Sequence, residues 1–239
     1  MHSLSIAVTT MTLLSFVTAA PRGMTKRTTD SKSTTPELSL TAQLQLADIA
    51  TDRYALLNDT DFVFDYDSSV TGMANRKSYP ALVGTGGSMA VATFPPCSIA
   101  ALHVHPRSSE LFVVVSGRIL TEMAPESGVV TTANGTQQRV IRTELHPKQM
   151  TVFPQGSYHT QINPDCTPAL TVASFNSEDP GAGLTAPGLF ALGDDFVVPN
   201  FGQAFDGEDV DRIRHLLPQQ AIFTIETCLK TCGIKKRGV

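Results

Sequence analysis

Short apolar runs, separated by Gly, Pro, Asn or Ser, recur between about residues 79 and 176. Strand-favouring residues dominate these runs, which lie at 88–94, 111–115, 139–145, 150–153 and 170–175. Many short strands with frequent turns are typical of a β-sandwich or β-barrel. The pattern therefore predicts an all-β core.

The segments before this core have a different pattern. Residues 38–57 carry apolar side chains at near-helical spacing, which predicts a short helix. Residues 61–66 alternate between polar and apolar positions, which predicts a strand. We therefore expect a short N-terminal helix and one further strand ahead of the core.

The segments after the core predict a helical arm. In residues 208–217, the side chains of Val210, Ile213 and Leu217 share one helical face. Residues 219–231 predict a second helix, which ends before a glycine. The expected fold class is thus all-β, a single barrel with a C-terminal helical arm.

The beginning of the chain is apolar from Leu4 to Ala20 and has the small residues Ala19 and Ala20 at its end. This predicts a signal peptide over residues 1–20, and hence secretion. A membrane anchor is the alternative. The run contains several Thr and Ser and is short for a span, so we expect no membrane span after cleavage.

The remaining organisation follows from composition. Residues 21–36 are polar and predict a flexible leader, either processed after Lys26-Arg27 or retained as an arm. Residues 37–234 form the expected single domain, and residues 235–239 form a basic tail.

Composition and charge narrow the class of protein. The chain is 41% hydrophobic and 17% charged, as in ordinary globular proteins, and its net charge of −4 gives no case for nucleic-acid binding. Four cysteines in an exported chain predict two disulfides, for which three pairings exist. Asn58 and Asn134 begin N-x-[ST] sequons and are expected glycosylation sites.

The segment around His103 and His105 carries the candidate chemistry. Side chains two apart on a strand share a face, so both imidazoles can point into a barrel. Glu110 is an odd number of residues beyond His105, so it could not share the face of the two histidines on one continuous strand. We therefore expect residues 106–109 to form a loop before the next strand. A third histidine, His159, follows 49 residues after Glu110.

Three imidazoles and one carboxylate make a metal site of three nitrogens and one oxygen. This donor set suits Mn, Fe, Co, Ni or Zn and is too rich in nitrogen for Ca or Mg. A six-coordinate metal would keep two positions for water or substrate, as in catalytic sites. For the other histidines of the mature chain, His146 and His215, we expect no ligand role.

These residues resemble the two motifs of the germin-like cupins, both in residue type and in spacing. The first motif is matched by His103, His105, Glu110 and Gly117, and the second by Pro154, Gly156, His159 and Asn163. Cys97 and Lys148 stand where the leading glycines of the two motifs are expected. Segments 62–65, 79–83, 175–180 and 228–233 resemble the fungal, spherulin-type branch, and the likeness spans residues 38–234.

The resemblance implies a jelly-roll β-barrel with a manganese ion on His103, His105, Glu110 and His159. It also implies a homo-oligomer, a trimer or hexamer, in which the C-terminal helices clasp a neighbouring subunit. The apolar face of helix 208–217 fits that role, or it covers its own barrel.

Two departures from the germin pattern matter. Plant germins carry an N-terminal disulfide, but no cysteine precedes Cys97, so we expect the pairs Cys97–Cys166 and Cys228–Cys232 instead. Germin oxalate oxidases have an Asn three residues before the first metal-binding histidine, where this chain has Ala100. Oxalate carries two carboxylates, and a buried anion needs fixed hydrogen-bond donors. Arg107 is near in sequence, but it matches a position common in the family, so oxalate oxidation is disfavoured.

Three functions remain open. The first is a metal-dependent oxidoreductase acting on superoxide, or on a small organic substrate with dioxygen, in an apolar pocket near Ala101, Leu102 and Val104. The second is a metal-dependent isomerase or cyclase of fungal secondary metabolism. The third is a non-enzymatic extracellular wall, storage or stress protein. Tyr158 and Gln161 either line the pocket or serve strand packing.

Overall fold

The strands in the middle of the chain bury every second side chain. In β10 (Ala169–Phe175), buried and half-buried residues alternate along the whole strand. This period is what two facing sheets require, since one side of each strand meets the core. The computed structural model describes residues 37–131, 135–202, 204, 206–218 and 220–235.

One sheet has five antiparallel strands. Their order is β1 (Met73–Ala74), β2 (Ser88–Phe94), β10, β5 (Glu110–Ser116) and β8 (Met150–Phe153). The predicted strands at 88–94, 111–115, 150–153 and 170–175 are confirmed within one residue at either end.

The other sheet has seven strands. β11 (Gly183–Leu184), β4 (His103–Val104), β9 (Tyr158–Asn163), β3 (Ser98–Ala100) and β12 (Ile222–Thr224) lie in that order, while β6 (Ile119–Ala124) pairs with β9 and with β7 (Ile141–Leu145).

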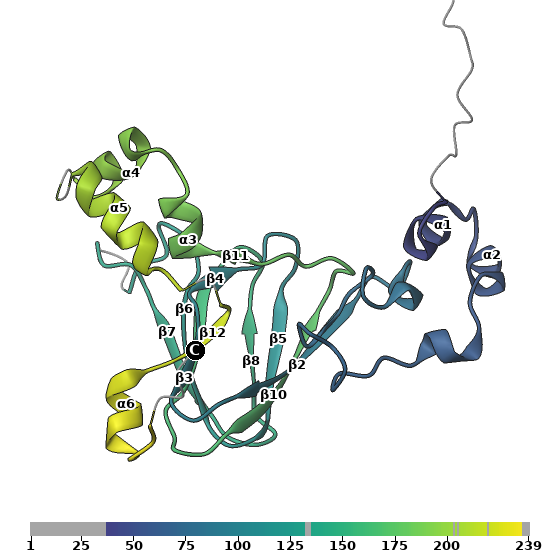
Figure 1. Cartoon of the computed structure of the whole chain (residues 1–239), viewed down its shortest axis with the longest axis horizontal. Helices are drawn as coiled ribbons and strands as arrows, with labels where there is room; N and C mark the ends of the chain where they lie inside the picture. Colours follow the sequence, from purple (N-terminus) through teal and green to yellow (C-terminus); the bar gives the residue numbers. More distant parts are fainter. Residues whose placement is uncertain (1–36, 132–134, 203, 205, 219, 236–239) are drawn as a thin grey trace, which may run out of the picture. The chain divides into compact units, whose positions relative to one another are not determined.

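The two sheets face each other across an apolar core (Figure 1). Large buried side chains come from both sheets, among them Phe94, Phe112, Ile119, Phe153 and Phe175. Burial of this apolar area is the main stabilising contribution to the fold. The predicted jelly-roll β-barrel is confirmed.

Gly117 makes the tight turn between β5 and β6 possible. Its φ is +80°, and a Cβ at this position would lie 2.8 Å from the Cα of Ala169. Any other residue would therefore force the backbone of β10 to move.

Cys97 and Lys148 adopt the left-handed conformation that the family motifs assign to glycine. Their φ angles are +55° and +71°, and they are the two non-glycine residues with positive φ in the described part of the chain. The Lys148 backbone N–H donates to the carbonyl of Val114, which ties this turn to β5. The motif position thus specifies a backbone conformation, which this chain keeps without glycine.

The N-terminal segment differs from its prediction in part. The expected helix is split into α1 (Leu40–Leu46) and α2 (Ala50–Ala55). The expected strand at 61–66 is wrong, because the short 3-10 helix η1 (Asp59–Phe62) forms there instead. A capping box between Asn58 and Asp61 stabilises the beginning of this helix. A second such helix, η2 (Pro80–Leu82), follows β1.

The C-terminal arm contains α3 (Thr185–Phe190), α4 (Asp194–Asn200), α5 (Gly207–Leu216) and α6 (Glu226–Thr231). α3 to α5 lie at the end of the sheet where β4 and β11 lie, and α6 lies at the other end (Figure 1). The single helix predicted at 219–231 is wrong in its first half, since β12 pairs with β3 there. Among the described residues, no helix is long and apolar enough to cross a membrane.

The apolar face of α5 packs within its own chain. Val210 is fully buried against Phe190 of α3 and Val197 of α4, with Ile213 and Leu217 beside them. This face covers neighbouring helices, so these residues give no support to the expected clasp on another subunit. The homo-oligomer itself stays a prediction.

Both disulfides connect α6 to the barrel, which corrects the predicted pairing. The bonds are Cys97–Cys228 and Cys166–Cys232, with Cα–Cα distances of 5.4 and 5.5 Å. Cys228 and Cys232 are four residues apart, so both project from one face of α6. That face meets Cys97 and Cys166, and each helical cysteine bonds to a barrel cysteine.

Several predictions fall on residues that the structure does not describe. They are the signal peptide at 1–20, the leader at 21–36, the sequon residue Asn134 and the tail beyond Lys235. Asn58 is exposed, and its glycosylation stays a prediction.

The backbone at Lys148 generates the first test. Lys148→Gly should raise the free energy of unfolding by about 1 kcal/mol, since it removes left-handed strain. Chemical denaturation of the folded protein would measure this change. Lys77→Gly is the control; Lys77 has no positive φ, and its replacement should destabilise. A loss of stability in Lys148→Gly as well would contradict the argument.

The disulfides generate a second test. Peptide mapping without reduction should recover a Cys97–Cys228 and a Cys166–Cys232 peptide. Removing the first bond with Cys97→Ser and Cys228→Ala should cost about 4 kcal/mol of unfolding free energy, since it closes a loop of 131 residues. A peptide that links Cys97 to Cys166 would show that the connectivity is wrong.

Candidate metal centre

The four predicted ligand side chains converge on one point inside the barrel. One nitrogen or oxygen from each of His103, His105, Glu110 and His159 lies within 4.8 Å of the others. His105, Glu110 and His159 are buried, and His103 is half-buried. Residues separated by up to 56 positions in the sequence thus form a single cluster.

Strand pairing explains the convergence. His103 in β4 lies directly opposite His159 in β9. Glu110, the first residue of β5, belongs to the facing sheet, and residues 106–109 form the predicted loop before it. The cluster therefore bridges the two sheets of the barrel.

Backbone carbonyls orient all three imidazoles. The Nδ1 atoms of His103, His105 and His159 donate to the carbonyls of Ala101, Gly181 and Ser157, at 2.7, 2.6 and 2.9 Å. A carbonyl only accepts, so each Nδ1 carries a proton, and Nε2 is left as the ring nitrogen that could bind a metal. Without a metal, an imidazole that donates from Nε2 to Glu110 carries a second proton on that nitrogen. The Nε2 atoms of His105 and His159 lie 2.9 and 3.1 Å from the Glu110 carboxylate.

Electrostatics keeps the carboxylate ionised despite its burial. Burial alone would raise the pKa of Glu110, but hydrogen bonds from His105 and His159 lower it to about 2. Burial, together with repulsion from His159, lowers the pKa of His103 to about 4. Burial also opposes the charged form of His105, but its bonds to Glu110 and Gly181 raise its pKa.

Two aromatic rings hold the cluster in place. Phe153 stacks on His159 with ring centres 4.2 Å apart and planes 11° apart. Phe175 packs edge-on against His105 at 4.7 Å. These contacts restrict the rotamers of both imidazoles.

A cavity of about 190 Å³ adjoins the cluster inside the barrel. His103, His105 and Glu110 form part of its wall, and the rest is mostly apolar. Ala100 lines it, at the position where the germin pattern has Asn. No Lys or Arg is among the described residues that line this cavity.

The other residues that the sequence suggested for the pocket do not all line the cavity. Arg107 does not line the cavity and pairs with Asp179 at 2.8 Å. Tyr158 is exposed, whereas Gln161 lines the cavity. The predicted apolar pocket beside the cluster is present, but Ala101, Leu102 and Val104 are not among its lining residues, and Leu102 is exposed.

The apolar wall comes instead from β2, β10 and β12, which sequence analysis did not link to the site. Ala90, Ala92 and Ala173 are examples. In the sequence, the pattern that could have indicated this wall is the small residue at every second position of β2. The motif residue Asn163 has a structural role, since its side chain donates to three backbone carbonyls at the base of the barrel.

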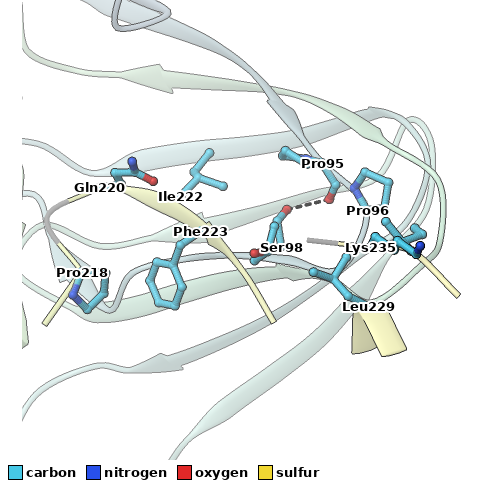
Figure 2. Close-up of a pocket in the computed structure, with 11 residues that line it drawn as sticks. Pro95, Pro96, Ser98, Pro218, Gln220, Ile222, Phe223, Leu229 and Lys235 are labelled. Atoms are coloured by element: carbon cyan, nitrogen blue, oxygen red, sulfur yellow. Dashed lines mark hydrogen bonds between the residues drawn. The ribbon is translucent and has the colours of Figure 1, made fainter. Parts of the chain in front are cut away.

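A larger hollow of about 720 Å³ lies beside β12 and α6 (Figure 2). It is lined mainly by proline and apolar side chains, and the Ser98 hydroxyl donates to the carbonyl of Pro95 across its edge. It contains no histidine or carboxylate among its described lining residues. The cluster in the barrel is therefore the candidate for chemistry.

The pKa of His103 generates a test on the metal-free protein. An unfolded histidine titrates near 6.5 and folded His103 near 4, so below pH 6.5 the unfolded chain takes up the extra proton. Stability should fall as the pH falls through this window. Between pH 7 and 4, the wild type should lose about 3 kcal/mol more than His103→Gln, measured by urea unfolding with a chelator present. Parallel pH profiles would contradict this.

Known proteins share this architecture. The cupin family matches residues 54–204 of the chain. Spherulin-1A of Physarum polycephalum is 34% identical over 216 residues, which cover 85% of this chain and 82% of that protein. Germin-like protein subfamily 1 member 1 of Arabidopsis thaliana is 34% identical over 157 residues, covering 64% and 66% of the two chains.

A solved structure of oxalate oxidase in complex with the substrate analogue glycolate has a similar fold. Its TM-score is 0.52 at 20% sequence identity, and the match covers 67% of this chain and 85% of that one. The fold, the paired motifs and the sequence similarity agree: the chain belongs to the cupin family, as a germin-like cupin of the spherulin type.

Proposed function

We propose that the chain is a secreted, metal-dependent oxidoreductase. His103, His105, Glu110 and His159 would bind one manganese ion, and the reaction would involve superoxide, or a small organic substrate together with dioxygen. The observation that carries this proposal is the convergence of the four side chains beside an internal cavity.

The donor set fits a divalent transition metal. Three imidazole nitrogens and one ionised carboxylate are borderline-to-hard ligands, which suit manganese, iron or zinc. Each histidine already donates its Nδ1 proton to a carbonyl, the arrangement that fixes a metal-binding imidazole. Manganese is the metal that the germin resemblance implies.

The chain's own residues would hold and shield the reacting centre. Bound metal would supply the one-electron redox chemistry. Glu110 would balance part of its charge, and Phe153 and Phe175 would exclude water from one side of the cluster. Substrate would approach through the cavity, on the side where His103 is half-buried.

The cavity argues against oxalate as the substrate. A buried dicarboxylate needs fixed cationic or N–H donors. Ala100 has no polar side chain, and the nearby Arg107 is engaged with Asp179 outside the cavity. Superoxide, which needs only the metal and access, places no such demand on the wall.

The same apolar cavity favours the second candidate function, a metal-dependent isomerase or cyclase acting on a hydrophobic metabolite. Uptake of dioxygen or loss of superoxide during turnover distinguishes the two. In the third candidate, a wall, storage or stress protein, the metal would stabilise the barrel without turnover. Secretion is supported by two disulfides, which persist in oxidising compartments.

Metal content tests the site directly. Purified protein should contain about one manganese or iron per chain by elemental analysis, since four donors already converge. His103→Ala should lose it. His215→Ala is the matched control, because His215 is an exposed histidine on α5, and it should keep the metal. Protein without metal would refute the site, and zinc alone would favour the non-redox candidates.

Activity tests the reaction class. Superoxide loss and dioxygen uptake should be measured on wild type, His103→Ala and His215→Ala at equal concentration. We expect activity in the wild type and the control, and at least a hundredfold loss in His103→Ala. A fully metallated protein that is inactive in both assays would rule out the oxidoreductase.

A further inference from the structure

The four cysteines lie together where α6 meets the barrel. Two disulfides, Cys97–Cys228 and Cys166–Cys232, join them in pairs. The two pairs are in contact, because the sulfur of Cys97 lies 3.5 Å from the sulfur of Cys232. The sulfurs of Cys97, Cys228 and Cys232 all lie within 4.8 Å of one another. The two disulfides therefore form one continuous cluster of sulfur atoms.

Burial differs from one end of this cluster to the other. In the outer pair, Cys166 is exposed and Cys232 is half-buried. In the inner pair, Cys228 is half-buried and Cys97 is fully buried. Exchange between a thiol and a disulfide begins with attack of a thiolate on one sulfur, so it depends on access to that sulfur. Cys166 is thus the most accessible point of entry for an external thiol.

The inner pair has a hydrogen-bond acceptor beside it. The sulfur of Cys228 lies 3.4 Å from the carbonyl oxygen of Pro164. In the disulfide this sulfur carries no hydrogen, but a released thiol would donate to that carbonyl. The barrel therefore provides a partner for a free Cys228 thiol.

We propose that Cys166 reacts with low-molecular-weight thiols, and that the cluster passes the exchange inward to Cys228. The external thiolate attacks the Cys166 sulfur, and the electron pair of the broken bond goes to Cys232. Released from Cys166, the Cys232 side chain rotates into line with the inner bond and attacks the Cys97 sulfur. The inner bond breaks, and Cys228 leaves as a thiolate that takes a proton from water.

The exchange conserves the number of disulfides. Afterwards the protein has a mixed disulfide at Cys166, a new Cys97–Cys232 bond and one thiol at Cys228. α6 remains attached to the barrel, since Cys232 directly follows its last residue. Cys232 is also no longer free to expel the bound thiol from Cys166, so the modification persists. This reactivity does not depend on the metal cluster or on the proposed function.

Glutathione is the probe that tests this reaction. Folded wild-type protein would be incubated with it at about pH 8 without denaturant, quenched with acid and alkylated with N-ethylmaleimide before peptide mapping. We expect glutathione on Cys166 and a new Cys97–Cys232 peptide. Maleimide on Cys228 should exceed that on Cys232 by about twofold, the ratio that one weak hydrogen bond supplies.

Three results would overturn the proposal. Glutathione mainly on a cysteine other than Cys166 would contradict the point of entry, and so would folded protein that does not react. Maleimide on Cys232 at or above the level on Cys228, with the Cys97–Cys228 bond intact, would contradict the inward transfer.

Two double variants isolate the steps, and each keeps one bond between α6 and the barrel. In Cys97→Ser with Cys228→Ala the inner bond is absent, so glutathione should still bind to Cys166 but maleimide should label Cys232. In Cys166→Ser with Cys232→Ala the inner bond stands alone, and glutathione uptake should fall at least about tenfold. Uptake equal to that of the wild type in the second variant would also refute entry at Cys166. The wild-type map decides the question even where a variant does not fold.

Discussion

The structure depends on one buried carboxylate. Glu110 is 3% exposed in the core of a β-barrel, where an unpaired charge would be strongly destabilising. Two imidazoles from the opposite sheet hydrogen-bond to it, and their other nitrogens are bound to backbone carbonyls. The polar cluster therefore links the two sheets, and a cation at its centre would offset the charge of the carboxylate.

A separate backbone constraint operates at the turns that precede β3 and β8. The two positions where the family motifs have glycine are occupied by Cys97 and Lys148, yet both keep a left-handed conformation. Long-range backbone hydrogen bonds hold them there, from the Cys97 N–H to the carbonyl of Asp165 and from the Lys148 N–H to the carbonyl of Val114. At Cys97 the side chain has a further use, since it bonds to Cys228 and attaches α6 to the barrel.

The cavity beside the cluster has a mostly apolar wall. An oxalate oxidase has a similar fold, whereas this chain places Ala100 and other small apolar residues around the cluster. A wall of that kind cannot compensate a dicarboxylate, because burial removes the water that would otherwise solvate it. The lining of the cavity thus limits which molecules could reach the cluster.

The amino-acid sequence by itself determined the strand core, the four clustered side chains and the family. Hydrophobic alternation and motif spacing are local properties, so 88–94 or 103–110 could be interpreted without coordinates. The disulfide pairing, β12 and the cavity wall were decided by tertiary structure. Cys228 and Cys232 share a helical face that meets Cys97 and Cys166, and Ile222–Thr224 extends because β3 offers an open edge. Such outcomes depend on which segments meet in space, and local pattern carries no information about those contacts.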